Sequence, residues 1–191
     1  MCNTRKVIRL VRHGPSAHAW PTQRITAEEF REWIRVMNET GIAADSHPPG
    51  ELAPSIGDTA VVVCSDYRRS VESATRLVPD CKPRVSILFR EVGRPWSGSW
   101  SVRLPLAVWD LGSRVLWWMN WITTDESIYT ARRRARDATF KLVGLADEYA
   151  DVLLVGHGML NALIGRELWR LGWQGPRRAT DEYWGMSTYQ K

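Results

Sequence analysis

The amino-acid sequence predicts an α/β fold, with a mostly parallel central sheet covered by helices on both faces. Residues 6–11, 60–64 and 151–155 are short segments made mostly of apolar residues, which is the pattern of strands buried on both faces. Segments with helical spacing of apolar residues separate them, and this alternation indicates parallel strands joined by helical crossovers. A length of 191 residues suits one domain with a substantial core.

Capping residues and spacing place the first helix. Thr26 and Glu29 have the spacing of a capping box at the start of residues 26–40, and Gly41 suits the end. Apolar residues recur at helical spacing between these ends. Residues 44–58 are rich in proline and glycine, which predicts a loop.

The rest of the chain is divided on the same grounds. Ser65 or Asp66 is expected to cap the helix that follows the strand at 60–64. The remaining predicted elements are a strand over 85–89, a loop over 90–103, helices over 104–122, 127–149 and 159–171, and strands over 151–155 and 183–189. One face of the helix over 104–122 is expected to point inward, and it carries Leu111, Val115, Trp118 and Ile122.

We expect residues 1–191 to form a single domain, because no repeat, low-complexity tract or domain linker interrupts the sequence. A helical segment over about 104–124 is expected to form a lid-like insertion. The chain has 11 tryptophans, and Trp117, Trp118 and Trp121 widen the apolar face of this segment. We expect these side chains to contact the core or a second copy of the chain, so a homodimer is a candidate assembly.

Composition limits the partners and the compartment. The formal net charge is +5, from 26 basic and 21 acidic residues, which is a modest bias that does not predict nucleic-acid binding. Three cysteines without close spacing argue against a disulfide framework or a zinc site, and they suit a reducing cytoplasm. The N-terminus has no signal-peptide pattern, and no apolar run reaches about 18 residues. We therefore expect a cytoplasmic protein without membrane contact.

Four loops leave the carboxyl ends of the predicted strands, which is the edge where such sheets bind ligands. In chain order they carry Arg12 and His13, Arg68 and Arg69, Glu91, and His157. Arginines suit an anion such as phosphate, and a neutral imidazole can attack phosphorus. A carboxylic acid can protonate the departing alkoxide. The arginines and the second histidine can neutralise the charge on the transferring group, so neither a metal nor a cofactor is expected.

Four segments of the sequence resemble the histidine phosphatase superfamily, which includes the cofactor-dependent phosphoglycerate mutases. They are LVRHG, CSDYRRSVESA, LFRE and LVGHG, and they occur in order between residue 7 and about residue 163. The resemblance implies the three-layer fold of the phosphoglycerate mutases, and it implies that His13 is the phosphorylated nucleophile. Arg12, Arg69 and His157 would then hold the phosphoryl group, with Glu91 as the proton donor. Arg69 matches rather than Arg68 because it stands four residues after Ser65.

Two departures from the family bear on the activity. EVGRPWSGSW stands where the mutases carry an E-R-x-Y-G-like stretch that helps to recognise phosphoglycerate. His157 is followed by Gly158 rather than by the aspartate of the acid-phosphatase branch, so Glu91 is the expected donor. We expect a metal-independent phosphomonoesterase that acts on a small phosphorylated metabolite through a phosphohistidine. The alternatives are a mutase-like phosphotransferase, a phosphoprotein (phosphohistidine) phosphatase and a non-catalytic binder of phosphorylated ligands.

Further residues are candidates for secondary roles. The candidates for substrate contact are Ser16, Trp96, Trp100 and Arg132, with packing as the equal alternative for the two tryptophans. Arg132 belongs to a stretch in which four of the five positions 132–136 are arginine, and most of that face is expected to be solvated. Asp66 and Glu72 are the alternatives to Glu91 as the acid. His18 and His47 are expected at the surface or in the lid.

Overall fold

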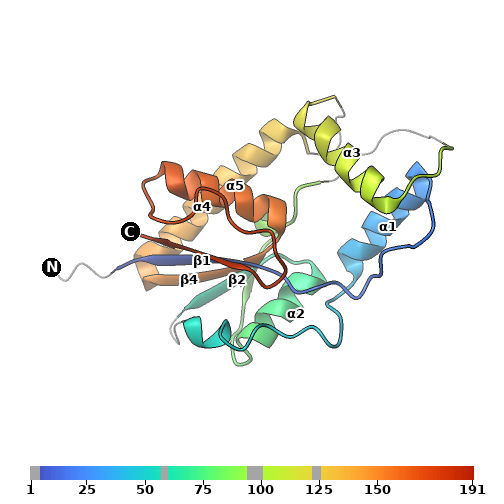
Figure 1. Cartoon of the computed structure of the whole chain (residues 1–191). Helices are drawn as coiled ribbons and strands as arrows, with labels where there is room; N and C mark the ends of the chain where they lie inside the picture. Colours follow the sequence, from blue (N-terminus) through green and yellow to red (C-terminus); the bar gives the residue numbers. More distant parts are fainter. Residues whose placement is uncertain (1–4, 57–59, 94–100, 122–125) are drawn as a thin grey trace.

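The computed structural model confirms the α/β class (Figure 1) and describes residues 5–56, 60–93, 101–121 and 126–191. Its strands are β1 (Val7–Arg12), β2 (Val61–Cys64), β3 (Arg84–Val85), β4 (Asp151–Gly156) and β5 (Met186–Gln190). They form one sheet in the order β3-β2-β4-β1-β5. The first four strands are parallel to their neighbours, and β5 runs antiparallel beside β1.

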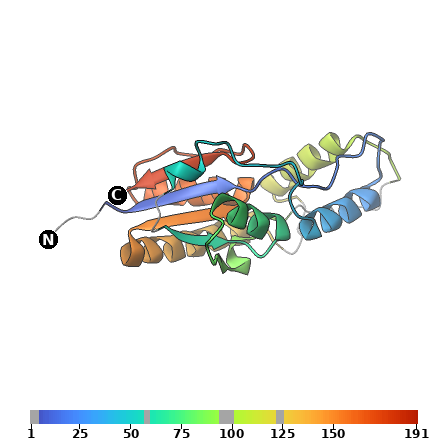
Figure 2. The ribbon, with the colours of Figure 1, turned by 90° about the horizontal axis from the view of Figure 1, so that it is seen from below.

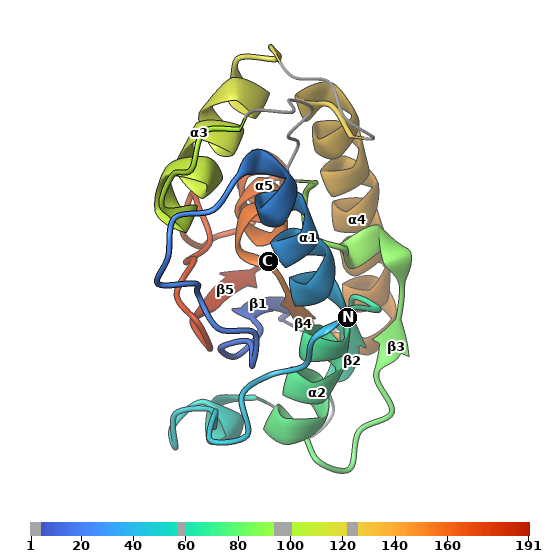
Figure 3. The same cartoon turned by 90° about the vertical axis from the view of Figure 1, so that its right-hand side faces the viewer.

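Helices cover both faces of the sheet (Figures 1 and 3). The helices are α1 (Ala27–Glu39), α2 (Arg68–Leu77), α3 (Leu106–Trp118), α4 (Ile128–Tyr149) and α5 (Gly158–Arg170), with short 3-10 turns at Ala53–Ser55 and Ile87–Phe89. Alternate residues of each strand enter two separate cores, as the period of a strand requires. Ile8 and Leu10 pack with α4 and α5, whereas Val11 packs on the other face with α2.

Two helices, α1 and α3, lie together beyond the carboxyl ends of the parallel strands (Figure 2). A third apolar cluster joins them, in which the rings of Phe30 and Trp109 stack with their centroids 6.2 Å apart. The Trp109 indole donates a hydrogen bond of 2.8 Å to the Ile25 carbonyl. The predicted capping box at Thr26 and Glu29 is confirmed and fixes the start of α1. Among the described residues, no helix is both long and apolar enough to cross a membrane.

Two predictions about caps and strands are wrong. Neither Ser65 nor Asp66 caps α2, because its N-cap is Tyr67 and the other two side chains have distant partners. The Ser65 hydroxyl hydrogen-bonds the His157 ring, and the Asp66 carboxylate pairs with Arg90. The strand predicted at 85–89 ends at residue 85, since the chain then turns into a 3-10 helix capped by the Ser86 hydroxyl. The last strand begins at residue 186 rather than 183.

The predicted inner face of α3 is also wrong. Leu111 is 65% exposed, and Val115 and Trp118 are each 47% exposed. The buried face instead carries Leu106, Trp109, Ser113 and Trp117. Helix α3 is apolar around much of its circumference, so spacing cannot choose a face, and the position of α1 decides it. Ile122, predicted on the same face, lies outside the described residues.

Candidate active site

The centre of the candidate site is the His13 ring, which follows β1 directly and is 6% exposed. Its Nδ1 lies 2.7 Å from the Gly14 carbonyl oxygen. A carbonyl only accepts hydrogen bonds, so Nδ1 carries the proton and the Nε2 lone pair is directed away from the backbone. Burial lowers the pKa of His13 well below its usual value of 6.5, and the nearby His157 and Arg69 lower it further. The imidazole is therefore neutral at pH 7, which is the form that a nucleophile needs.

Arg69 is the arginine that reaches this ring. It lies on the buried face of α2, is 2% exposed, and its Nε donates to His13 Nε2 at 3.2 Å. Its other nitrogens donate to the Met37 carbonyl at 2.7 Å and to the Asn38 side-chain oxygen at 3.3 Å. These contacts with the end of α1 hold the guanidinium beside the nucleophile. Arg68, one residue earlier, points to solvent and pairs with Glu72.

His157 completes the centre. It follows β4 as the N-cap of α5, is fully buried, and its ring centroid lies 5.0 Å from that of His13. The neighbouring strands β1 and β4 pair with Arg12 opposite Gly156, so the residue after each strand reaches the same edge. The Ser65 hydroxyl lies 2.6 Å from His157 Nε2 and fixes the ring. The sequence does not reveal this role of Ser65, because spacing along the chain indicates caps and not partners 92 residues apart.

Arg12 borders the centre on the side of the C-terminal segment. Its guanidinium donates to the Asp181 carbonyl and lies 4.0 Å from the centroid of the Tyr183 ring. That ring is also 5.7 Å from the ring of His13. Within the described part of the chain, the buried Nε of Arg12 has no hydrogen-bond partner. The arrangement therefore leaves a donor beside His13 that an anion could satisfy.

Gly14, the residue after His13, lies in close contact with side chains from two other segments of the chain. A Cβ at this position would lie 2.5 Å from the Trp184 ring and 2.6 Å from the Ser46 hydroxyl oxygen. The Trp184 indole itself donates to that hydroxyl at 3.0 Å. The glycine thus permits the C-terminal segment to pack against the loop of the nucleophile.

Glu91 lies at the N-terminus of α5, to which backbone hydrogen bonds attach its carboxylate. Its Oε1 accepts from the backbone N–H groups of Val92 and Leu160 at 2.9 and 3.1 Å. Its Oε2 accepts from the N–H of Met159 at 3.4 Å. Since α5 starts directly after His157, these contacts bring the Glu91 carboxylate to the same end of the sheet as the two histidines.

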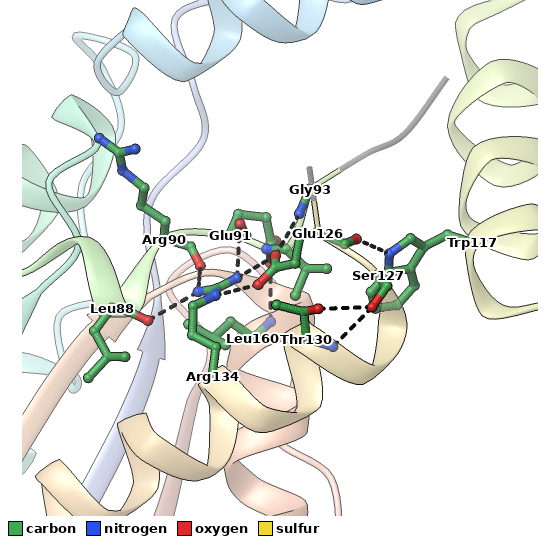
Figure 4. Close-up of polar contacts among 11 residues, drawn as sticks. Leu88, Arg90, Glu91, Gly93, Trp117, Glu126, Ser127, Thr130, Arg134 and Leu160 are labelled. Carbon is green, nitrogen blue, oxygen red and sulfur yellow. Dashed lines mark hydrogen bonds and ion pairs between the residues drawn. The ribbon is translucent and has the colours of Figure 1, made fainter. Parts of the chain in front are cut away.

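The loop that carries Glu91 is held by an ion pair that no sequence motif indicates (Figure 4). Arg134 pairs with Glu126 at 2.6 and 2.8 Å, and both side chains are largely buried. The same guanidinium donates to the carbonyls of Leu88, Arg90 and Glu91, at 3.1, 2.6 and 3.4 Å. The Glu126 carboxylate accepts from the Gly93 N–H at 3.3 Å. The pair therefore holds the backbone on both sides of Glu91.

The spacing of alanines along α4 indicates that Arg134 faces inward, although it does not indicate the partner of Arg134. Buried alanines recur along α4 at positions 131, 135 and 138, which defines its inner face. Arg134 lies on that face, whereas Arg132, the predicted substrate contact, is exposed and its guanidinium lies 5.6 Å from the Trp118 ring on α3. The structure thus gives the inward position to a different arginine of the run.

Removal of Arg134 should destabilise the fold. Arg134→Met leaves the Glu126 carboxylate, which is 15% exposed, without its cation and leaves three backbone carbonyls without that donor. We expect a loss of about 2–4 kcal/mol in the free energy of unfolding, measured by urea denaturation. Arg68→Met is the matched control, because it breaks an ion pair whose arginine is 70% exposed, and we expect about 0–1 kcal/mol. Equal losses in the two variants would show that the buried pair contributes nothing beyond a surface pair.

The other candidates lie as follows. The Ser16 hydroxyl donates to the Gly41 carbonyl at 3.4 Å and accepts from the His18 N–H at 3.2 Å, so it is engaged in a local turn. Trp96 and Trp100 lie outside the described residues. Asp66 pairs with Arg90, while Glu72 accepts from Arg68 and from the Ile42 N–H. In the part of the chain that the structure describes, no three His, Cys, Asp or Glu side chains are grouped as metal ligands.

The sequence profile of the histidine phosphatase superfamily, branch 1, matches residues 8–188. The chain belongs to this superfamily, which confirms the resemblance seen in its four motifs. A search of curated proteins gives no significant match.

Several solved structures with the same fold are described as phosphatases. The native mycobacterial glucosyl-3-phosphoglycerate phosphatase is 21% identical with a TM-score of 0.62, over 96% of this chain and 90% of that chain. A putative alpha-ribazole-5'-P phosphatase from Escherichia coli is 18% identical with a TM-score of 0.56, over 85% and 79%. A phosphoserine phosphatase mutant from Entamoeba histolytica is 12% identical with a TM-score of 0.52, over 95% and 89%. Family membership and these neighbours support phosphatase activity for this chain.

Proposed function

We propose that the protein is a metal-independent phosphomonoesterase that transfers the phosphoryl group of a small metabolite to His13 and then to water. One observation carries this proposal: a neutral, buried histidine has its Nε2 lone pair beside Arg69 and a second histidine. Such a pairing of a nucleophile with fixed cations suits attack on a phosphate ester. The whole chain acts as one domain in this proposal, and α3 serves as its lid-like insertion.

In the first step, His13 Nε2 attacks phosphorus while the bond from phosphorus to the ester oxygen breaks. Arg12, Arg69 and His157 hold the three remaining phosphoryl oxygens and compensate the charge that develops on them. Glu91 gives its proton to the departing alkoxide, so the alcohol leaves neutral. The Nδ1 proton of His13 stays on the ring, where the Gly14 carbonyl stabilises the positive charge of the phosphoimidazole.

In the second step, a water molecule attacks the phosphorus of the phosphohistidine. Glu91, now ionised, takes a proton from that water, and the bond between Nε2 and phosphorus breaks. Inorganic phosphate leaves, and His13 returns to its neutral form. The same carboxyl group therefore acts first as an acid and then as a base.

The alternative carboxylates are less suited to the role of the acid. The hydrogen bond from Arg90 lowers the pKa of Asp66, which favours the ionised form that has no proton to give. Glu72 already accepts hydrogen bonds from Arg68 and the Ile42 N–H on the outer side of α2. Glu91 is favoured by its position, because its carboxylate lies at the start of α5, directly after His157 and at the same end of the sheet as His13.

A covalent phosphohistidine should be trapped on His13. The protein is mixed with a phosphate monoester, denatured within one turnover and digested, and the peptides are read by mass spectrometry under alkaline conditions. We expect phosphate on the peptide that contains His13, and its loss on brief exposure to acid. Phosphate on a serine, or turnover with no covalent phosphate under any quenching condition, would contradict the mechanism.

Binding of inorganic phosphate should raise the pKa of His13. In the free protein, burial and the adjacent cations lower this pKa, so the imidazolium forms only well below pH 6.5. A phosphate dianion beside the ring stabilises the imidazolium, so the titration should move to higher pH when phosphate is present. Nitrogen-15 NMR of the histidine rings measures the shift. The resonance of His18, whose ring lies against Trp33, is the control and should not respond to phosphate. An unchanged His13 titration would place the anion elsewhere.

A further inference from the structure

The exposed apolar face of α3 borders a groove that leads away from the Glu91 carboxyl group. A small recess at Glu91 is lined by Met159, Arg114 and Trp117, among others. Met159 also lines a depression of about 580 Å³, together with Leu111, Val115 and Trp118 of α3. A further depression of about 490 Å³ shares Trp118 and Met159 and continues along α5. We call these two depressions the α3–α5 groove.

The inner end of this groove lies next to two parts of the candidate site, the guanidinium of Arg12 and the carboxylate of Glu91. Asp181 lines it, and the backbone carbonyl of Asp181 accepts a hydrogen bond from the guanidinium of Arg12. The backbone N–H of Met159 faces the Glu91 carboxylate. An alcohol that receives its proton from Glu91 would therefore leave into this groove. The walls of the groove would then contact the alcohol part of the substrate, and the phosphate oxygens would stay at the edge of the sheet.

The outer end of the groove combines an apolar floor with cations. Met159, Leu163 and Arg166 follow one another on a single face of α5 at helical spacing. Arg177 and Arg178 face them from the segment before β5. Among the described residues, none of the three arginines has a carboxylate partner, and Arg177 lies over the Trp169 ring, 5.2 Å from its centroid. By contrast, Arg114 at the inner end is neutralised by Asp110 at 3.1 Å.

The distance between Met159 at the inner end and Arg166 at the outer end sets the length of a ligand that spans the groove. Met159 and Arg166 are seven residues apart on α5, which corresponds to about 10 Å along the helix axis. Between these two residues the wall is formed by Trp118, Ala162 and Leu163, and the charged side chains at the far end are all arginines. Small-molecule sites typically have this construction, with apolar walls and a few polar groups that fix orientation.

We propose, on the basis of the function proposed above, that the substrate is a phosphomonoester whose alcohol has an apolar body and a second anion at its far end. The apolar body lies against Trp118, Met159 and Leu163. The second anion, a carboxylate or a phosphate, binds Arg166 and Arg178. The groove thereby selects the substrate, while the histidines and arginines at the edge of the sheet bind the phosphoryl group that reacts.

Matched synthetic esters test this proposal. The series consists of alkyl phosphates of increasing chain length that end in a methyl group, a carboxylate or a second phosphate. For each variant we measure a selectivity ratio, the kcat/KM of the doubly anionic ester divided by that of the methyl-ended ester. We expect a ratio of about 10–100 for the wild-type protein at the best chain length, from charge-assisted hydrogen bonds at the far end. The carboxylate and phosphate arms identify which anion the groove prefers.

Substitution of one arginine should reduce this ratio. Arg166→Gln is expected to reduce it about tenfold, because one charged donor is lost. Arg133→Gln is the matched control, since that arginine is exposed on α4 and lines neither depression, and it should leave the ratio unchanged. A wild-type ratio near one, or equal ratios in the two variants, would overturn the proposal.

Alkyl phosphonates with the same end groups separate the groove from the proposed function. They cannot be hydrolysed, so calorimetry with them measures binding in the groove even if no ester turns over. Failure of turnover with retained preference for the doubly anionic phosphonate would reject the proposed function but keep the groove.

A second copy of the chain is the other candidate occupant of the apolar face. Its presence is tested by the oligomeric state of the wild-type protein and of Trp118→Glu in solution. A dimer that this substitution converts to a monomer, with the selectivity ratio unchanged, would assign the face to self-association and reject the ligand. A wild-type monomer with the expected ratio would support the ligand.

Discussion

Replacement of His13 by asparagine should reduce the rate of phosphate release by about 10⁴–10⁶-fold, the range observed when a covalent nucleophile is removed. Asparagine is close in size to the imidazole, and its side-chain amide can still donate to the Gly14 carbonyl that now accepts from Nδ1. It has no basic nitrogen in place of Nε2, so the bond to phosphorus cannot form. Phosphate release from a chromogenic ester measures the loss, in the steady state for the wild-type protein and in a single turnover with the protein in excess for the slow variant.

The controls for this prediction separate chemistry from folding. The unfolding midpoint of His13→Asn in urea should stay close to that of the wild-type protein, because the variant removes a neutral, buried ring without leaving a buried charge. His18→Asn changes a histidine whose ring lies against Trp33, and it should retain normal turnover. Phosphate release by His13→Asn at the wild-type rate would show that another group attacks phosphorus.

Replacement of Glu91 by glutamine should slow the hydrolysis of alkyl phosphates by about 10²–10⁴-fold, which is the usual contribution of a general acid. An alkoxide is a poor leaving group and needs a proton as the ester bond breaks, whereas nitrophenolate leaves readily as an anion. The loss for nitrophenyl phosphate in the step that forms the phosphohistidine should therefore be much smaller. Single-turnover kinetics are required, because Glu91 also acts as the base in the second step.

The geometry favours glutamine as a mild replacement. The glutamine carbonyl oxygen can keep the hydrogen bonds that Oε1 accepts from the N–H groups of Val92 and Leu160. The amide nitrogen that replaces Oε2 cannot accept a hydrogen bond, so the 3.4 Å contact with the Met159 N–H is lost. Glu72→Gln is the control, since Glu72 is the carboxylate on α2 that pairs with Arg68. Equal slowing of both esters by Glu91→Gln would reduce Glu91 to a residue that positions phosphate. A leaving-group effect in Glu72→Gln instead would move the acid to α2.

Local sequence signals are sufficient to predict most elements of the fold. The capping box of Thr26 and Glu29 and the apolar runs of β2 and β4 depend on neighbours a few residues away, so spacing reveals them. Parallel strands present their carboxyl ends at one edge of the sheet, which brings together the loops after β1 and β4. For this reason the sequence alone predicts that His13 and His157 lie close to each other, as they do.

Other features depend on partners that are distant in the sequence, and they follow from the packing of the folded chain. Helix α3 has apolar residues on more than one face, and its contact with α1 determines that Trp109 is buried and Leu111 exposed. Arg134 is one of several arginines in a run, and its partner Glu126 and the carbonyls near Glu91 come from other segments. Local patterns predict the periodic elements and the residues at their ends, because these follow from interactions within a few residues. Which apolar face of α3 is buried and which arginine of the run points inward depend on packing between segments. A local pattern contains no information about that packing.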